Sequence, residues 1–155
     1  MPGAALIAAS VFGVDYVLKR AVESSMNIGE SVPLIPGVFH LTYIENPGGA
    51  FGILDGSPGI LMIGSIIAVG AVLWMLLAHP PSRYVTSGCG LVLGGAAGNL
   101  FDRIAAGAVT DYLDFRIWPV FNAADVAIVA GALMLAAAAF RAERTRPEES
   151  HSSGE

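Results

Sequence analysis

The stretch GLVLGGAAGNLFDRIAAGAVTDYLDFRIWPVFNAADVAIV, Gly90–Val129, decides how this chain is interpreted. It holds two apolar segments with a more polar connection between them. Asp102 ends the first segment, Asp111 lies in the connection and Asp125 lies inside the second segment. A carboxylate in hydrocarbon costs at least about 3 kcal/mol, so an acid in such surroundings is a functional hypothesis by default. The rest of the chain is interpreted as what positions these acids.

The composition is that of a membrane protein. Hydrophobic residues make up 54% of the 155 residues and charged residues only 14%, whereas a soluble domain carries about 25% charged residues. The formal net charge is −5, which offers no basic surface and argues against a nucleic-acid partner. The lone Cys89 lies in an apolar run and is interpreted as a small packed residue. The histidines are scattered, so we expect neither a metal site nor a cofactor.

Four segments approach the roughly 20 apolar residues that a membrane helix needs. They predict an all-α membrane protein with four transmembrane helices at about 4–20, 60–78, 85–104 and 121–141. The first segment lacks the basic start and the cleavage site of a signal peptide, so we expect a retained helix. Residues 1–146 are predicted to form one domain, and the polar residues 147–155 a disordered tail.

The orientation is predicted from the basic residues. Four helices place both termini on one side of the membrane, and a count of lysines and arginines is equal on the two sides. Lys19 and Arg103, on the far side, each have an acid within one helical turn that can neutralise them. The freer positive charges therefore favour cytoplasmic termini.

The connection of residues 21–59 is then extracytoplasmic and too long to be a simple turn. The segment VFHLTYIEN, residues 38–46, predicts a strand with Phe39, Leu41 and Tyr43 on one face. Prolines and a glycine in residues 33–37 predict a turn before it. A small extracytoplasmic β-containing region between the first two helices is therefore expected.

This strand runs into the loop NPGGAFG, residues 46–52. Asn46 can donate to and accept from a peptide group, and Gly48 allows a backbone to approach closely. A plain hairpin turn explains the motif about equally well. Phe51 weakens that explanation, because it adds an apolar side chain to a loop at the membrane surface.

Polar side chains recur at helical spacing in the first and third helices. Asp15 and Lys19 are four residues apart and can pair, either as an interfacial ion pair with Lys19 reaching outward or as part of a site. Glycines at positions 90, 94 and 98 form a stripe that favours close helix packing, and one further step of four reaches Asp102. Asn99 and Arg103 share that turn, and an Asp102–Arg103 cap or ion pair is the purely structural alternative.

The connection between the third and fourth helices contains two acids that periodicity separates. If residues 109–116 form a strand, Asp111 interrupts an apolar face, whereas Asp114 has polar neighbours and is expected to face solvent. If the stretch is helical, this separation fails. In the fourth helix, Asn122 suits an N-cap, but Asp125 lies inside the helix, where we expect no capping role.

Five motifs in this order, DYVLK, NPGGAF, GNLFDR, GAVTD and FNAAD, resemble those of the lipoprotein signal peptidases, also called signal peptidase II. Each motif alone is weak, but together they are specific and span the chain from the first helix to the fourth. The resemblance implies an intramembrane aspartic endopeptidase of the bacterial inner membrane. Its partners would be membrane lipid and prolipoproteins with a diacylglyceryl-modified lipobox cysteine, which it would cut just before that cysteine.

Carried over by motif, the resemblance implies that Asp111 and Asp125 are the catalytic pair. The residues expected to shape the site or hold the substrate are Asp15, Lys19, Asn46, Gly48, Phe51, Gly98, Asn99, Asp102, Arg103 and Asn122. We expect a monomer, with the active site toward the extracytoplasmic face. A small proton-coupled transporter is the alternative, because acids in helices also form proton relays. A non-catalytic assembly factor is a third possibility.

Overall fold

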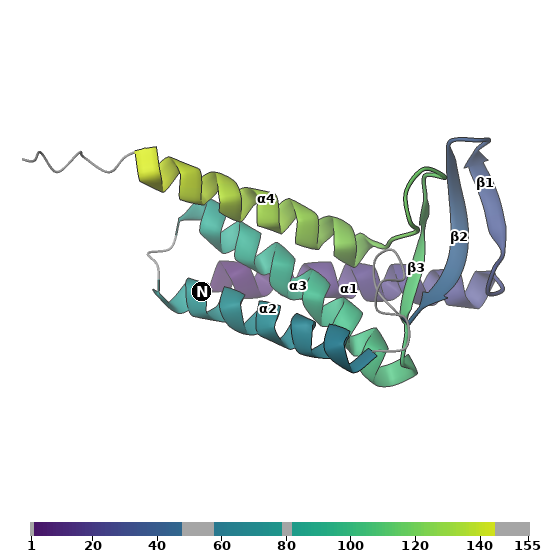
Figure 1. Ribbon diagram of the computed structural model, residues 1–155, viewed down its shortest axis with the longest axis horizontal. Coiled ribbons are helices and arrows are strands. Elements are labelled where there is room, and N and C mark those ends of the chain that lie inside the picture. The colour runs from purple at the N-terminus through teal and green to yellow at the C-terminus, as the bar shows by residue number, and fades with distance from the viewer. Residues whose placement is uncertain (1, 48–57, 79–81, 145–155) are drawn as a thin grey trace, which may run out of the picture.

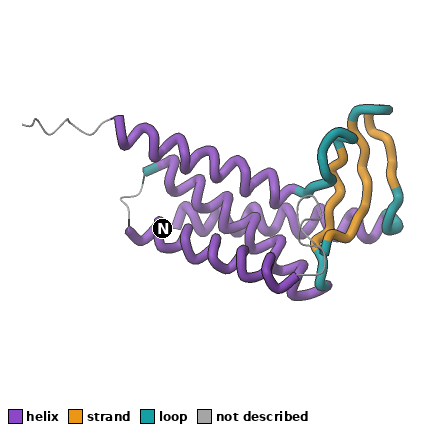
Figure 2. Tube along the Cα trace, in the orientation of Figure 1, coloured by secondary structure: helices purple, strands orange, loops and turns teal. Residues whose placement is uncertain are grey.

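The computed structural model describes residues 2–47, 58–78 and 82–144. The elements within these residues are α1 (Pro2–Ser25), β1 (Ser31–Ile35), β2 (Phe39–Asn46), α2 (Pro58–Ala78), α3 (Arg83–Ala106), β3 (Val109–Asp114) and α4 (Ala123–Arg144). The helices lie side by side as a bundle, and the strands form a small sheet at one end of it (Figure 1 and Figure 2). The start of α1 and the end of α4 lie together at the opposite end (Figure 1).

The four predicted helices are present, with shifted ends. α1 continues to Ser25 because its last turns are covered by the sheet: Val22 packs in one buried cluster with Tyr43 of β2 and Tyr112 of β3. α3 begins where the side chain of Ser82 accepts the Val85 N–H, and ends at Gly107 in the left-handed conformation. α4 begins two residues later than predicted, at Ala123.

The sheet is larger than predicted. β2 is the expected strand, but it is the middle member of an antiparallel sheet with the order β1-β2-β3. The expected turn at residues 33–37 is partly wrong, because Pro33 lies in β1, whereas residues 36–38 make the turn, with Gly37 at φ 74°. Proline is tolerated there because β1 is an edge strand, where a missing N–H leaves no ladder bond unmade. The sheet also includes β3, from between α3 and α4, so it is not confined to the connection between the first two helices.

Strand pairing places two of the predicted site residues side by side. Residues 109–114 form a strand, as the first alternative predicted. In the β2–β3 ladder Asn46 pairs with Val109 and Ile44 with Asp111, which brings the end of β2 to the segment that carries Asp111. The register shifts between Leu41 and Ile44, so the ladder is irregular beside Asp111.

α3 is the central helix, packed against α1, α2 and α4. The predicted glycine stripe forms its contact with α1: an added Cβ would lie 2.9 Å from the carbonyl oxygen of Ala4 at Gly90, and 2.6 Å from that of Ala8 at Gly94. At Gly98 the added Cβ would lie 2.5 Å from Oδ2 of Asp15. Cys89 is fully buried in an apolar cluster, as predicted.

This contact makes a testable prediction about stability. Gly94→Ala should lower the free energy of unfolding by about 1–3 kcal/mol, because backbone atoms of α1 must move to admit the methyl group. Gly13→Ala is the matched control, since a Cβ there meets nothing within 4 Å. Thermal unfolding of the purified protein in detergent micelles measures both. A Gly94→Ala protein as stable as Gly13→Ala would contradict the close α1–α3 contact.

Candidate active site

A buried lysine stands at the centre of the polar residues. The Nζ atom of Lys19 lies 2.8 Å from Oδ2 of Asp15 and 2.7 Å from Oδ2 of Asp102. It also donates a hydrogen bond of 2.9 Å to Oδ1 of Asn99. Lys19 is only 1% exposed, so the alternative of an interfacial pair with Lys19 reaching outward is wrong. A single ammonium joins α1 to α3 and pairs with two buried acids.

Asp102 is therefore not explained by a pair with its neighbour. It binds Lys19 on α1, whereas the guanidinium of Arg103 points elsewhere and its Nη1 donates weakly, at 3.4 Å, to the carbonyl oxygen of Asn99. The purely structural alternative of an Asp102–Arg103 ion pair is wrong. The contact that the structure gives Asp102 is with Lys19, which it helps to hold in place.

The side-chain amide of Asn99 connects Lys19 to α4 by hydrogen bonds. Its Oδ1 accepts from Lys19 and, at 3.1 Å, from Nδ2 of Asn122. Because the oxygen faces these donors, the Nδ2 group must face the other way, where it donates to Oδ1 of Asp125 at 2.8 Å. Asn99 thus presents a donor, and not an acceptor, to the carboxyl group of Asp125.

Asp125 also takes part in a helix cap, contrary to expectation. The backbone N–H of Asp125 donates to Oδ1 of Asn122 at 2.9 Å, and the N–H of Asn122 donates to Oδ2 of Asp125 at 3.2 Å. These reciprocal bonds form a capping box at the start of α4. Ala124 adds a third tie, since its N–H donates to Oδ1 of Asp15 at 2.9 Å. The helix start is therefore bonded to both α1 and the site.

Asp111 is held by amides from two directions. Nδ2 of Asn46 donates to its Oδ2 at 2.8 Å, and Nδ2 of Asn122 donates to its Oδ1 at 2.6 Å. The side chain is 2% exposed. Burial raises the pKa of Asp111 to about 7, against the hydrogen bond from Asn46 and with the help of the negative charge of Asp125. A proton is thus retained at Asp111 up to neutral pH.

Both acids line one cavity of about 360 Å³. Asn46, Asn99 and Arg103 line it too, together with an apolar wall of Val109, Trp118, Pro119, Val120, Phe121, Ile128 and Val129. The Nε atom of Arg103 is buried and has no hydrogen-bond partner among the described residues. The cavity therefore offers a neutral acid, a second acid, amides and a cation to one bound molecule.

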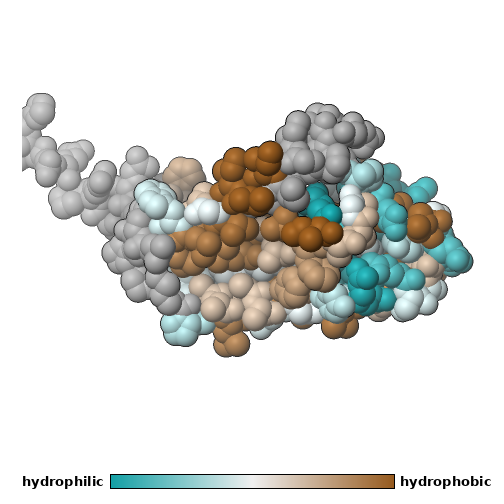
Figure 3. Space-filling model, turned by 90° about the horizontal axis from the view of Figure 1, so that it is seen from below, coloured by the Kyte–Doolittle hydropathy of each residue, from teal (hydrophilic) through white to brown (hydrophobic). Residues whose placement is uncertain are grey.

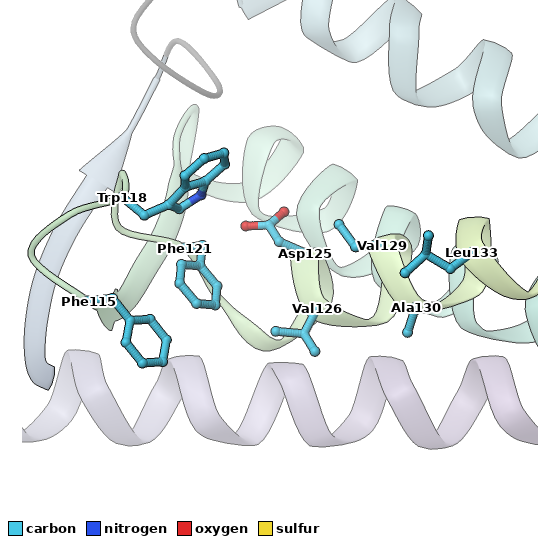
Figure 4. A pocket seen from close by; sticks show the side chains of 8 residues that line it. All are labelled: Phe115, Trp118, Phe121, Asp125, Val126, Val129, Ala130 and Leu133. Atoms are coloured by element: carbon cyan, nitrogen blue, oxygen red, sulfur yellow. The ribbon is translucent and has the colours of Figure 1, made fainter. Parts of the chain in front are cut away.

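A second hollow adjoins this cavity along α4. It is apolar, with a volume of about 530 Å³, and shares Trp118, Phe121, Asp125 and Val129 with the first. Figure 4 shows its aromatic side chains, Phe115 among them, on one side of Asp125, and Val129, Ala130 and Leu133 along the helix on the other. Asp125 is thus the point where the polar cavity meets an apolar groove.

Asp114 differs from Asp111 in its partners and not in its exposure. The expectation that it faces solvent is wrong, because it is 4% exposed. Thr42 donates to its Oδ2 at 2.8 Å, and the backbone N–H of Arg116 donates to its Oδ1 at 2.8 Å. Burial alone would raise its pKa, but these bonds and the guanidinium of Arg116 lower it below the usual value. Asp114 is an ionised structural acid.

The structure brings nearly all of the predicted site residues together at the junction of the bundle and the sheet. The members of this group are Asp15, Lys19, Asn46, Gly98, Asn99, Asp102, Arg103, Asp111, Asn122 and Asp125. Gly48 and Phe51 lie outside the described residues. Three residues next to this group were not predicted: Thr110 donates to Glu23, and the hydroxyl of Tyr112 accepts the N–H of Ala123 at the start of α4. Glu23 was detectable, because it extends the Asp15–Lys19 spacing by one more step of four.

The sequence of the chain matches a known protein family over most of its length. The family model described as signal peptidase (SPase) II matches residues 7–141. The chain belongs to the signal peptidase II family. Lipoprotein signal peptidases of Pelotomaculum thermopropionicum and Halothermothrix orenii are 49% and 47% identical to it, over 84% and 79% of this chain and 87% and 84% of theirs. None of these relatives supports the transporter alternative.

Solved structures agree with this assignment to signal peptidase II. A bacterial membrane enzyme structure at 2.3 Å resolution has a TM-score of 0.87 and 29% identity, and the match covers 97% of this chain and 94% of that one. A second, at 1.9 Å resolution, has a TM-score of 0.82 and 30% identity, over 91% and 94% of the two chains. The four helices and the small sheet thus share the fold of these two bacterial membrane enzymes.

The buried lysine yields a prediction for this signal peptidase II. Lys19→Met should lower the free energy of unfolding by about 3–5 kcal/mol, because it removes the ammonium that lies within 2.8 Å of both buried acids. Arg20→Met is the control: its guanidinium is 44% exposed, pairs with Glu23 at 2.7 Å and lies 3.7 Å from Asp102, so the loss should be at most about 1 kcal/mol. Chemical denaturation in micelles measures both, and equal losses would contradict the role of Lys19.

Proposed function

We propose that this chain is an aspartic endopeptidase that removes signal peptides from diacylglyceryl-modified prolipoproteins, with Asp111 and Asp125 as its catalytic pair. The observation that carries the proposal is the joint position of these acids. They come from β3 and α4, are linked through Asn122 and Asn99, and line one cavity in a chain of the signal peptidase II family.

The two acids have different environments, and this suggests their roles. Asp111 is buried and retains its proton near neutral pH, so we assign it as the acid that protonates the carbonyl oxygen of the scissile peptide. Asp125 is half-buried, faces both hollows and accepts hydrogen bonds on both oxygens. It suits the ionised base that takes a proton from water. Two adjacent carboxyl groups that share one proton are the basis of aspartic peptidase chemistry.

The reaction then needs no group beyond these acids and water. Water attacks the peptide carbonyl carbon as Asp125 accepts its proton and Asp111 gives its own to the carbonyl oxygen. The tetrahedral intermediate collapses when the carbon–nitrogen bond breaks. Asp125 returns its proton to the leaving amine, and the proton on the intermediate's oxygen returns to Asp111. The pair is restored to one neutral acid and one carboxylate.

The surrounding polar residues suit a peptide substrate. Asn46, Asn99 and Asn122 fix both acids through uncharged amides, which orient the carboxyl groups without adding a charge that would ionise or neutralise them. Arg103 lines the same cavity and has a buried donor available for a peptide carbonyl group. We propose that Arg103 holds the substrate backbone beside the acids.

The apolar groove suits the lipid of the substrate. It begins at Asp125 and runs along exposed α4 side chains, with Val126, Val129 and Leu133 between 50% and 67% exposed. A diacylglyceryl-cysteine next to the scissile bond would place its acyl chains there while the peptide occupies the polar cavity. Burial of apolar surface contributes about 25 cal/mol per Å², so long acyl chains would add strongly to binding.

We propose that all four helices cross the membrane, with cytoplasmic termini and the sheet on the extracytoplasmic side. One helix segment in the described residues, Ala123–Arg141, has the length and hydropathy of a membrane span. On the face in Figure 3, hydrophobic residues gather over the helices and hydrophilic ones toward the sheet. The catalytic pair lies at the sheet end of the bundle, so it would work near the extracytoplasmic surface of the membrane.

Cleavage of a diacylglyceryl-modified prolipoprotein by the purified protein tests the proposal. Asp111→Asn and Asp125→Asn should each lower kcat by about 10²–10⁴-fold, because each removes one partner in proton transfer. Asp114→Asn is the matched control: it removes a buried acid of the same strand that is not part of the cavity lining, and should stay within about tenfold of wild type.

Two outcomes would contradict separate parts of the proposal. Full activity of Asp111→Asn or Asp125→Asn would exclude these residues as the catalytic pair. Equal cleavage of an unlipidated precursor would leave the peptidase assignment in place but remove the lipid from the substrate.

A further inference from the structure

Glu23 extends the polar stripe of α1 toward the sheet. Asp15, Lys19 and Glu23 are four residues apart, so they lie along one side of the helix. The first two belong to the site through Lys19, whereas Glu23 stands one turn further on. Its Oε1 accepts a hydrogen bond of 2.7 Å from Oγ1 of Thr110, the residue before Asp111.

We propose that Glu23 is a positioning residue for Asp111, acting through Thr110. The proposal rests on the catalytic role of Asp111 proposed above. Neither Glu23 nor Thr110 lines the cavity that holds the acids, so their effect on the reaction would pass through the placement of β3.

The geometry of a strand explains how a contact at Thr110 sets Asp111. Successive side chains of a strand point to opposite faces, so fixing Thr110 toward α1 turns Asp111 toward Asn46 and Asn122. The β2–β3 ladder pairs Thr110 with Glu45 and Asp111 with Ile44, and its register shifts just beyond Asp111, between Leu41 and Ile44. The bond from Thr110, which is 5% exposed, holds this regular part of β3 against α1 next to the shift.

Charged groups around Glu23 hold its carboxylate in place. Nη1 of Arg20 lies 2.7 Å from Oε2 of Glu23, which leaves Oε1 for Thr110. Nη2 of the same arginine lies 3.7 Å from Oδ1 of Asp102, the partner of Lys19. The Tyr43 ring of β2 is close enough for the Glu23 charge to raise the pKa of its hydroxyl, although burial is the larger cause.

The consequence is that α1 positions both acids. Asp125 is held through Asn99 and Lys19, and Asp111 through Thr110 and Glu23. Two side chains of α1, one helical turn apart, then set the separation of the two acids, in place of the loops that join α3, β3 and α4.

Steady-state cleavage of a diacylglyceryl-modified prolipoprotein by the full-length protein tests this role. Thr110→Val keeps the shape of the side chain but removes the donor, and Glu23→Ala removes the acceptor. Each should lower kcat about 10- to 100-fold and leave KM within about twofold, because small misplacement of a catalytic group costs rate and not binding. The double variant should be no worse than the worse single variant, because both changes break the same contact.

Conservative variants separate positioning from general damage. Thr110→Ser keeps a hydroxyl and Glu23→Gln keeps an oxygen acceptor, so both should retain wild-type kcat within about threefold. Ser24→Ala removes an exposed hydroxyl on the same turn of α1, which bonds only the carbonyl oxygen of Ala21 among the described contacts, and should have no effect. If Thr110→Val does not fold, the comparison of Glu23→Ala with Glu23→Gln decides alone.

The role of Glu23 is overturned by wild-type kcat in Glu23→Ala, by additive losses in the double variant, or by a change confined to KM. Asp111→Asn is measured in the same assay. Full activity of Asp111→Asn would overturn the proposed function, whereas an inactive Asp111→Asn beside a fully active Glu23→Ala would overturn the positioning role alone.

Discussion

The contact of the Lys19 ammonium with Asp15, Asp102 and Asn99 is the constraint on which the site depends. A buried lysine is unfavourable unless charges and hydrogen bonds surround it. Its three partners belong to α1 and α3, so this one group fixes the relative position of two helices. The close approach of these helices requires the glycines that face α1, because a side chain at Gly98 would collide with Asp15.

Neutral amide groups connect Lys19 to the two acids by hydrogen bonds. Asn99 turns its donor to Asp125 because its oxygen faces Lys19, and Asn122 bonds both Asn99 and Asp111. Amides suit this task, since they donate and accept hydrogen bonds in defined directions and carry no charge. A charged residue in the place of either asparagine would change the shared protonation of the two acids, which an aspartic peptidase depends on.

Part of this arrangement is predictable from sequence and part is not. The glycine stripe and the Asp15–Lys19 spacing are local patterns, and each predicted residues that share a face of their helix. The alternation around Asp111 did not predict which side of β3 faces solvent, because both sides are buried. The partner of Lys19 was not predictable, because Asp102 and Asn99 lie more than 75 positions along the chain and only the fold brings them close. The family motifs identified these residues as a set without indicating which residue bonds to which.

Two errors have a common physical cause. Asp114 was expected in solvent because it shares a strand face with polar residues, and Asp125 was expected to have no cap role because it lies inside an apolar helix. In both cases a backbone N–H made the difference: Arg116 donates to Asp114, and Asn122 donates to Asp125. A hydrogen bond from a backbone N–H cannot be recognised from the residue types in the sequence. β1 was not predicted for a different reason: Pro33 is unusual in a strand, and only an edge position permits it.

We propose that Asp111 carries the proton that the catalytic pair uses at neutral pH. Infrared difference spectroscopy of the purified protein, with aspartate labelled by ¹³C, measures neutral carboxyl groups directly during a pH titration. We predict a neutral aspartic acid band at pH 6 that disappears as the pH rises through about 7, and that is lost in Asp111→Asn. A titration without such a band, or one that Asp111→Asn leaves unchanged, would show that Asp111 does not hold this proton.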